Sequence, residues 1–227
     1  MKFSLASRTA VEFLGTAFLV AAVVGSGIMG ERLSAGNDAI ALLANTLATG
    51  AALVALILAF GSISGAHFNP VVTVMEALRS AMHRRDVLPY ILAQFLGGVV
   101  GSLVAHIMFG LPAISLSLHA RSGPAQFFSE FVATFGLLCV IFGAARSRPA
   151  AIPIAVGAYI TAAYWFTAST SFANPAVTLA RCITNTFAGI RPIDVPWFIL
   201  AQCLGGFCAT ILFGAIERSA LAPSTTL

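Results

Sequence analysis

Two stretches decide the fold of this chain: Gly65-Ala66-His67-Phe68-Asn69-Pro70-Val71-Val72-Thr73 and Ser171-Phe172-Ala173-Asn174-Pro175-Ala176-Val177-Thr178. Both contain an Asn-Pro pair followed by a small apolar residue, then Val and Thr. Asn is a good helix N-cap, because its side-chain oxygen accepts a hydrogen bond from a free backbone N–H of the first turn. Pro suits the first helical position, where no N–H is needed. Each Asn-Pro pair therefore predicts the start of a short helix.

The composition around these pairs is that of a membrane protein. Of the 227 residues, 59% are hydrophobic and only 9% are charged, whereas a soluble domain carries about 25% charged residues. So few charges do not cover a water-facing surface, and the lipid bilayer is the expected surrounding. The net charge of +4 is spread along the chain without a basic tract, so no nucleic-acid partner is expected.

The cysteines give no sign of a metal site. Their positions, Cys139, Cys182, Cys203 and Cys208, match no zinc-binding spacing and form no disulfide framework. We therefore expect neither a metal nor another cofactor. The N-terminus carries two basic residues before a long apolar run with no cleavage signal after it, which predicts a retained first span and not a signal peptide.

Six apolar runs are long enough to span a membrane, which takes about 20 residues. They are Ala10–Met29, Ala39–Gly61, Val87–Phe109, Gln126–Ala145, Ala151–Ala168 and Pro196–Ile216. The two Asn-Pro helices, expected over Asn69–Met82 and Asn174–Thr186, lie outside these runs. At roughly 20 Å each, they are too short for a hydrocarbon core of about 30 Å. They are predicted to be re-entrant half-helices.

The order of signals repeats along the chain. The segment Glu12–Thr16 matches Glu130–Thr134, the two Asn-Pro pairs match, and Ala93–Gly98 matches Ala201–Gly206. We expect one channel domain over residues 1–227, with repeat 1 at about 8–110 and repeat 2 at about 125–218. Three spans per repeat are an odd number, so the second repeat enters the membrane in the opposite orientation. The pattern predicts an inverted repeat with a pseudo-two-fold axis in the membrane plane.

Basic residues set the predicted orientation, because cytoplasmic loops carry an excess of Lys and Arg. With the N-terminus inside, the cytoplasmic segments hold eight of the twelve: Lys2, Arg8, Arg79, Arg84, Arg85, Arg146, Arg148 and Arg218. Both termini are therefore expected in the cytoplasm, and the half-helices are expected to enter from opposite sides and meet near the midplane.

The meeting point has a defined chemistry. Two helix N-termini there place two partial positive charges, each roughly +0.5, at one depth, and a pore through them opposes protons and other cations. If the side-chain oxygens of Asn69 and Asn174 cap their own helices, both NH2 groups are left to donate into the lumen. Water or a neutral hydroxylated solute would accept these bonds.

These motifs make the chain resemble the aquaporin (major intrinsic protein) family. They are the boxes Asn69-Pro70-Val71 and Asn174-Pro175-Ala176, the stretch that leads from Ser64 into the first box, and the Glu-x-x-x-Thr pattern in the first span of each repeat. The resemblance implies an all-α polytopic bundle of six transmembrane helices plus two re-entrant half-helices. It also implies one pore per subunit, a homotetramer in the cell inner (plasma) membrane, and passive conduction of water or small neutral solutes without enzymatic activity.

The resemblance also assigns a selectivity filter. The family usually has Arg directly after the second box, and here that position is Val177; its spacing places the other filter positions at Thr49, Ala162 and Ser171. Such a filter, with neither charge nor aromatic ring, is expected to be wide and to pass glycerol, urea and uncharged metalloid hydroxides such as arsenite. The Asn-Pro-Ala-Val box resembles the bacterial branch associated with arsenic resistance. In the alternative, a water-selective aquaporin, Arg181 restores the missing charge from one helical turn further on.

Other polar residues are expected in supporting positions. Glu12 and Glu130 are predicted to accept hydrogen bonds from the backbone of the Asn-Pro loops, with a proton relay as the alternative. Gln94 and Gln202 are expected to bond the same loops or neighbouring helices. His67 is predicted to line the pore, with a packed loop histidine as the alternative.

Three further classes of protein compete with a channel. A coupled transporter also uses inverted repeats and broken helices, but it needs an ion-binding site at the midplane, where this chain offers two amides and two positive dipole ends. A membrane enzyme would need a catalytic cluster that the repeat leaves unexplained, and none is apparent in the sequence. A structural junction protein would have little use for the preserved Asn pair.

Overall fold

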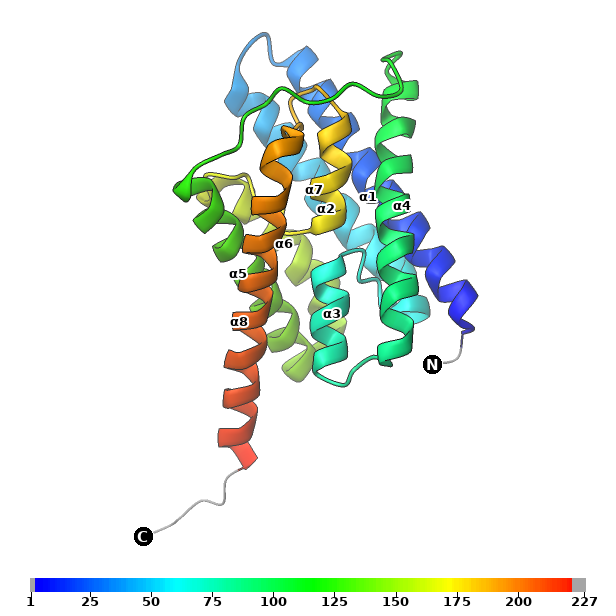
Figure 1. The fold of residues 1–227 in the computed structure, drawn as a ribbon, viewed down its shortest axis with the longest axis vertical. Coiled ribbons are helices and arrows are strands. Elements are labelled where there is room, and N and C mark those ends of the chain that lie inside the picture. The colour runs from blue at the N-terminus through cyan, green and yellow to red at the C-terminus, as the bar shows by residue number, and fades with distance from the viewer. Residues whose placement is uncertain (1–2, 222–227) are drawn as a thin grey trace.

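The computed structural model describes residues 3–221, and these form a bundle of helices joined by loops (Figure 1). The long helices are α1 (Leu5–Leu33), α2 (Asp38–Ser64), α4 (Arg84–Met108), α5 (Pro124–Ser147), α6 (Ile152–Phe166) and α8 (Val195–Leu221). Two short helices, α3 (Pro70–Leu78) and α7 (Pro175–Ala180), follow the Asn-Pro pairs, and single 3-10 turns lie at Pro149–Ala151, Arg181–Ile183 and Pro192–Asp194.

The six predicted spans coincide with the six long helices to within a few residues, and most helices extend beyond the apolar runs. Capping explains the extension of two N-termini. The Ser4 hydroxyl accepts from the Ser7 N–H at 3.1 Å, and the Asn37 side chain accepts from the N–H groups of Ala39 and Ile40. Polar residues that satisfy the first turn let a helix begin before its apolar stretch does.

The half-helices are shorter than predicted. Helix α3 has nine residues and ends at Leu78 with Arg79 as its C-cap, because Ser80 adopts a left-handed backbone with φ of 61°. Helix α7 has six residues and tightens into a 3-10 turn at Arg181. In Figure 1, α3 occupies the lower half of the bundle and α7 the upper half. Helix α1 begins and α8 ends at the lower side of the bundle, which we call the terminus side. We call the upper side of the bundle the opposite side.

The two repeats pack in equivalent ways. Helix α1 packs against α2 and α4, and α5 packs in the same way against α6 and α8. Glycines make the closest of these contacts possible. A Cβ added at Gly97 would collide with the backbone of Phe13, and one at Gly205 would collide with the backbone of Phe131. The equivalent Gly-Gly pairs are therefore close helix crossings, as small residues often are in membrane bundles.

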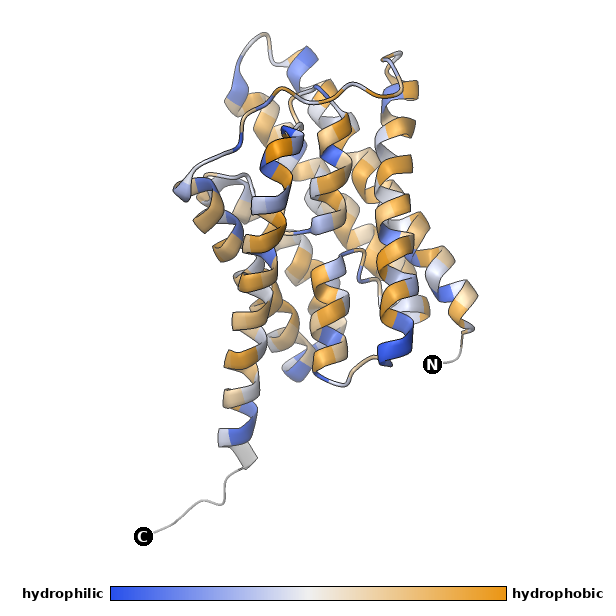
Figure 2. Cartoon of the chain, in the orientation of Figure 1, coloured by the Kyte–Doolittle hydropathy of each residue, from blue (hydrophilic) through white to orange (hydrophobic). Residues whose placement is uncertain are grey.

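The outer faces of the bundle suit lipid. Within residues 3–221, six helical segments are long and apolar enough to cross a membrane. Figure 2 shows mostly hydrophobic residues along them, with hydrophilic residues gathered towards their ends. Large apolar side chains are exposed on these faces, among them Phe18, Leu47, Leu58, Leu96 and Trp197. The predicted fold class, an all-α polytopic bundle with two half-helices in an inverted repeat, is confirmed.

The glycine crossings generate a first prediction. Gly205→Ala places a methyl group against the Phe131 carbonyl and should destabilise the protein by about 1–3 kcal/mol through overpacking. Gly143→Ala is the matched control, because its added Cβ meets only the Phe213 ring at ordinary contact distance, 3.7 Å. Thermal unfolding of the purified protein in detergent measures both. Equal melting temperatures for the two variants would show that the crossing is not tight.

Candidate functional site

The loop before α3 is held by the carboxylate of Glu12, which is fully buried in α1. One carboxylate oxygen accepts from the Ser64 hydroxyl at 2.6 Å and from the His67 N–H at 3.0 Å. The other accepts from the Phe68 N–H at 2.7 Å and from the Gln94 amide at 2.8 Å. Four donors compensate for burying this charge, and they fix the loop backbone relative to α1 and α4.

The loop before α7 is held in the same way by Glu130, which is fully buried in α5. Its oxygens accept from the Ser169 hydroxyl at 2.6 Å, the Phe172 N–H at 2.8 Å, the Ala173 N–H at 2.9 Å and the Gln202 amide at 2.6 Å. Each contact has its counterpart in the first repeat. These are the positions and partners that the sequence led us to expect for the two glutamates and the two glutamines.

Backbone conformation in these loops is unusual. Phe68 and Ala173, the residues directly before the two Asn, have positive φ values of 49° and 48°. Such left-handed geometry costs non-glycine residues on the order of 1–3 kcal/mol and persists only where the surroundings enforce it. Here the glutamates bind the N–H groups of both residues. The carbonyl oxygens of the same residues are thereby left to face the opposite loop.

The two Asn side chains brace the loops against each other. The Asn69 amide donates to the Ala173 carbonyl and the Asn174 amide donates to the Phe68 carbonyl, both at 2.7 Å. Each side-chain oxygen caps its own helix, that of Asn69 through the Val71 N–H at 3.0 Å. The sequence predicts that each NH2 donates into the lumen, and the structure uses part of this donor capacity for the opposite loop. One hydrogen of each amide is bound to the opposite loop, and one remains for the cavity that both residues line.

The paired Asn side chains line a cavity of about 480 Å³. On the opposite side, its lining includes Thr49, Tyr164, Ser171, Phe172, Val177 and Arg181. On the terminus side, it includes His67, Val72, Glu76, Met82 and Tyr90. The cavity therefore joins the two halves of the bundle through the point where the half-helices meet.

Three of the four predicted filter positions line this cavity, namely Thr49, Ser171 and Val177. Ala162 does not; it is exposed on α6. Every fourth residue of α6 from Ile152 to Tyr164 faces the cavity, and a position two residues before Tyr164 points to the other side of the helix. Tyr164 is the α6 residue at this level, and its hydroxyl lies 3.4 Å from that of Thr49. The expectation of no aromatic ring here is therefore wrong.

Arg181 is almost completely buried, with 2% of its surface exposed, and it lines the cavity. Its Nε donates to the Ala188 carbonyl, and its guanidinium carbon lies 3.3 Å from the centre of the Phe172 ring. Arg121 approaches the same ring at 5.0 Å. The sequence spacing placed Arg181 one turn beyond Val177, but it gave no sign that Phe172 would bring a second arginine close to it.

Arg121 ties the outer loops together. Its Nε donates to the Gly189 carbonyl at 2.8 Å and its Nη1 to the Ser169 carbonyl at 3.2 Å. Its backbone N–H donates to the Asp194 carboxylate at 2.8 Å. Burial lowers the pKa of the Arg121 guanidinium. The residues that Arg121 binds are too distant from it in the sequence for any motif to reveal this role.

His67 lines the terminus-side half of the cavity. Its Nδ1 lies 3.1 Å from the Thr73 hydroxyl, and its ring centre lies 5.5 Å from that of Tyr90. The Tyr90 hydroxyl donates to the Ser64 carbonyl at 2.9 Å, which joins this half of the cavity to the loop held by Glu12. Tyr90 is a lining residue that the sequence did not reveal.

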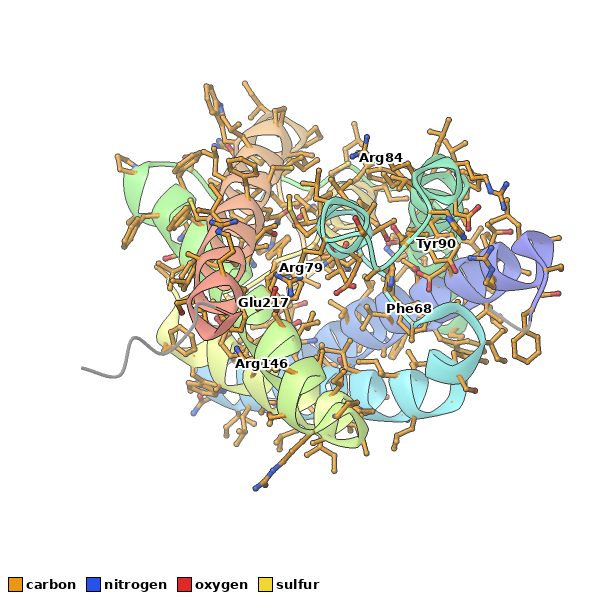
Figure 3. All side chains as sticks on the ribbon, turned by 90° about the horizontal axis from the view of Figure 1, so that it is seen from below. Phe68, Arg79, Arg84, Tyr90, Arg146 and Glu217 are labelled. Atoms are coloured by element: carbon orange, nitrogen blue, oxygen red, sulfur yellow. The ribbon has the colours of Figure 1, made fainter. Side chains whose placement is uncertain are left out.

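Charged residues gather on the terminus side of the bundle. Figure 3, seen from below, shows Arg79 and Glu217 side by side with Arg146 near them. Arg79 donates to Glu217 at 2.5 Å and lies 4.3 Å from the centre of the Phe142 ring. This ion pair joins the end of α3 to the last turns of α8.

Six spans, two opposed half-helices and a cavity between their capped N-termini together define an aquaporin-like membrane channel. The chain belongs to the family described as major intrinsic protein, whose model matches residues 1–167 and 147–226. The resemblance drawn from the paired Asn-Pro boxes is thus confirmed at the level of the family. The relatives described next are channel proteins and not enzymes.

Two curated relatives and one solved structure show the range of similarity. Aquaglyceroporin AqpS of Rhizobium meliloti (strain 1021) is 56% identical over 211 residues, which cover 93% of this chain and 90% of the relative. Aquaporin AqpM of Methanothermobacter thermautotrophicus is 30% identical over 240 residues, covering 92% and 97%. The structure of the aquaglyceroporin from Plasmodium falciparum shares the fold, with a TM-score of 0.76, 22% identity, and coverage of 92% and 96%.

The carboxylate clamps generate a second prediction. Glu130→Gln leaves one acceptor oxygen where four donors converge, and it adds an NH2 group that faces donors. We expect a loss of about 3 kcal/mol or more in stability, seen as a lower melting temperature and a lower folded yield. Glu31→Gln, at an exposed position, is the control. A Glu130→Gln protein as stable as this control would mean that the clamp does not hold the loop.

Proposed function

We propose that this chain is a passive channel for small uncharged solutes, namely glycerol- and urea-sized molecules, metalloid hydroxides such as arsenite, and water. The observation that carries the proposal is the cavity that runs between Asn69 and Asn174 and is lined on both sides of them. Each Asn amide keeps one hydrogen for that cavity after bracing the opposite loop. A neutral solute accepts a hydrogen bond from these amides through an oxygen atom. Its passage therefore requires no ion-binding site.

The groups at the midplane favour a channel over a coupled transporter. The N-termini of α3 and α7 meet at the Asn pair, and their dipoles set a positive potential there. The two midplane carboxylates each take four hydrogen bonds and stay outside the cavity lining. Glu76 does line the cavity, but it lies towards the C-terminal end of α3, away from the meeting point. Neither a proton relay nor a sodium site is supported at the midplane.

The short side chain at position 177 favours solutes larger than water. The position directly after the second box holds Val177, whose short apolar side chain leaves room that a long charged one would fill. The most similar relative named above is called an aquaglyceroporin, which agrees with passage of a polyol. Neutral arsenite is a small trihydroxide, so it presents the same kind of oxygen to the amides. We therefore propose that the chain belongs to the arsenic-associated branch.

We further propose that the channel is a homotetramer in the inner (plasma) membrane with both termini in the cytoplasm. The chain ends of α1 and α8 lie on one side of the bundle, and that side carries most of the basic residues, as expected for a cytoplasmic face.

Flux measurements test this proposal. Proteoliposomes should show water and glycerol permeabilities well above those of empty liposomes in stopped-flow light scattering, and arsenite should enter them in parallel uptake measurements. Water flux without any solute flux would refute the proposed width. The absence of all three would refute the channel itself.

The width argument generates a further prediction. Val177→Arg should fill the cavity beside Ser171 and lower glycerol flux at least about tenfold while reducing water flux much less, because glycerol occupies more of the cross-section. Val177→Leu, similar in position but uncharged and shorter, should have a smaller effect on glycerol. Equal losses of water and glycerol flux in Val177→Arg would show that Val177 does not set the width.

A further inference from the structure

We propose that Glu76 makes the terminus-side half of the cavity unfavourable for anions, so that the channel rejects solutes of either charge. The positive groups at the midplane and beyond it oppose cations, and Glu76 supplies the charge of the other sign. Glu76 is then a specificity-determining residue. The inference rests on the proposed function and sharpens its solute class, because a weak acid then passes as the uncharged molecule and not as its conjugate anion.

The first observation is the position of Glu76 on α3. Asn69, Val72 and Glu76 all line the cavity, and their spacing of three and four residues places them in one row along the helix. Asn69 is the N-cap of α3, so the backbone of Glu76 lies about 10 Å further along the helix axis. This row therefore leads from the Asn pair towards the terminus side, and Glu76 is its charged member.

The second observation is that the Glu76 carboxylate has no partner in the protein. Within residues 3–221, this side chain takes part in no hydrogen bond and no ion pair, and it is partly exposed. Arg79 follows it by three residues on the same helix, but its guanidinium is bound to Glu217 at 2.5 Å and lies 4.3 Å from the centre of the Phe142 ring. The charge of Glu76 is therefore left to act on the cavity.

The other acidic residues do not duplicate this charge. Among the described residues that line the cavity, Glu76 is the one carboxylate. Glu12 and Glu130 lie outside the lining, and each takes four hydrogen bonds. His67 and Tyr90 line the same half as Glu76, and both side chains have hydrogen-bonding partners of their own.

The groups that oppose cations in this channel attract anions. The N-termini of α3 and α7 set a positive potential at the Asn pair. Arg181 lines the cavity beyond them, and a guanidinium stays charged. Arg84 and Arg146 add positive charge at the terminus side (Figure 3). An anion arriving from that side would be drawn towards the midplane if no negative charge preceded it.

Glu76 opposes this attraction before a solute reaches the Asn pair. The C-terminal end of α3 reinforces it, because the aligned peptide dipoles leave a partial negative charge there. A like charge at about 4 Å lowers the local concentration of a monovalent anion roughly fivefold in bulk water, and more where protein displaces the water. A neutral polyol or hydroxide carries no net charge and is not repelled in this way.

Iodide entry into proteoliposomes, followed by quenching of an enclosed fluorescent dye, tests the barrier. Water and glycerol permeabilities are measured on the same vesicles. The unmodified protein should admit iodide no faster than empty liposomes do. Glu76→Gln, which keeps the size of the side chain and removes its charge, should raise iodide permeability at least about fivefold. Its water and glycerol permeabilities should change less than about twofold.

Two further variants separate charge from shape. Glu76→Asp keeps the carboxylate and should remain closed to iodide, and Glu31→Gln removes a carboxylate at an exposed position outside the cavity lining. Glu76→Ala replaces Glu76→Gln if the latter protein does not conduct water.

The proposal is overturned if the uncharged Glu76 variant admits iodide no faster than Glu31→Gln. It is also overturned if Glu76→Asp admits as much iodide as Glu76→Gln, or if the unmodified protein conducts iodide. Absence of water and glycerol flux in the unmodified protein would instead refute the proposed function.

Discussion

Two buried carboxylates support the structure around the pore. A charge at membrane depth is expensive, and Glu12 and Glu130 offset this cost through four hydrogen bonds each. Two of the donors in each set are backbone N–H groups of the loop that leads into a half-helix. Irregular backbone within a membrane is tolerated only where protein covers it or water reaches it. The glutamates therefore allow a helix to begin in the middle of the bilayer.

The symmetry of the repeats turns two such loops into one site. Each glutamate binds the N–H groups of its own loop, and the Asn of the other loop donates to a carbonyl of that loop. Neither repeat completes this arrangement alone. Gly98 and Gly206 also join the two repeats, because each lets a long helix approach the half-helix of the other repeat. The loops, the half-helices and the cavity thus depend on both halves of the chain together.

Much of the fold and of the site was predictable from the sequence, because these features follow from local chemistry. The apolar runs, the Asn-Pro caps and the repeated glutamates determine the spans, the half-helices and the loop clamps, and each is visible in a short window of sequence. Ala162 was misplaced because a filter position counted along the chain ignores the rotation of α6, whose cavity face passes through Tyr164. The cross-bracing of the Asn amides and the stacking of Arg181 on Phe172 join residues remote in sequence or on different elements, and no local pattern carries that information.

The central claim is that two capped half-helix N-termini, joined by the Asn amides, let neutral molecules pass and exclude cations. The most direct measurement is the proton conductance of proteoliposomes under an imposed pH gradient, taken on the same preparation as the water permeability. The account predicts water permeability well above that of empty liposomes with a proton conductance no higher than theirs. A proton conductance that rises with the amount of reconstituted protein would contradict it.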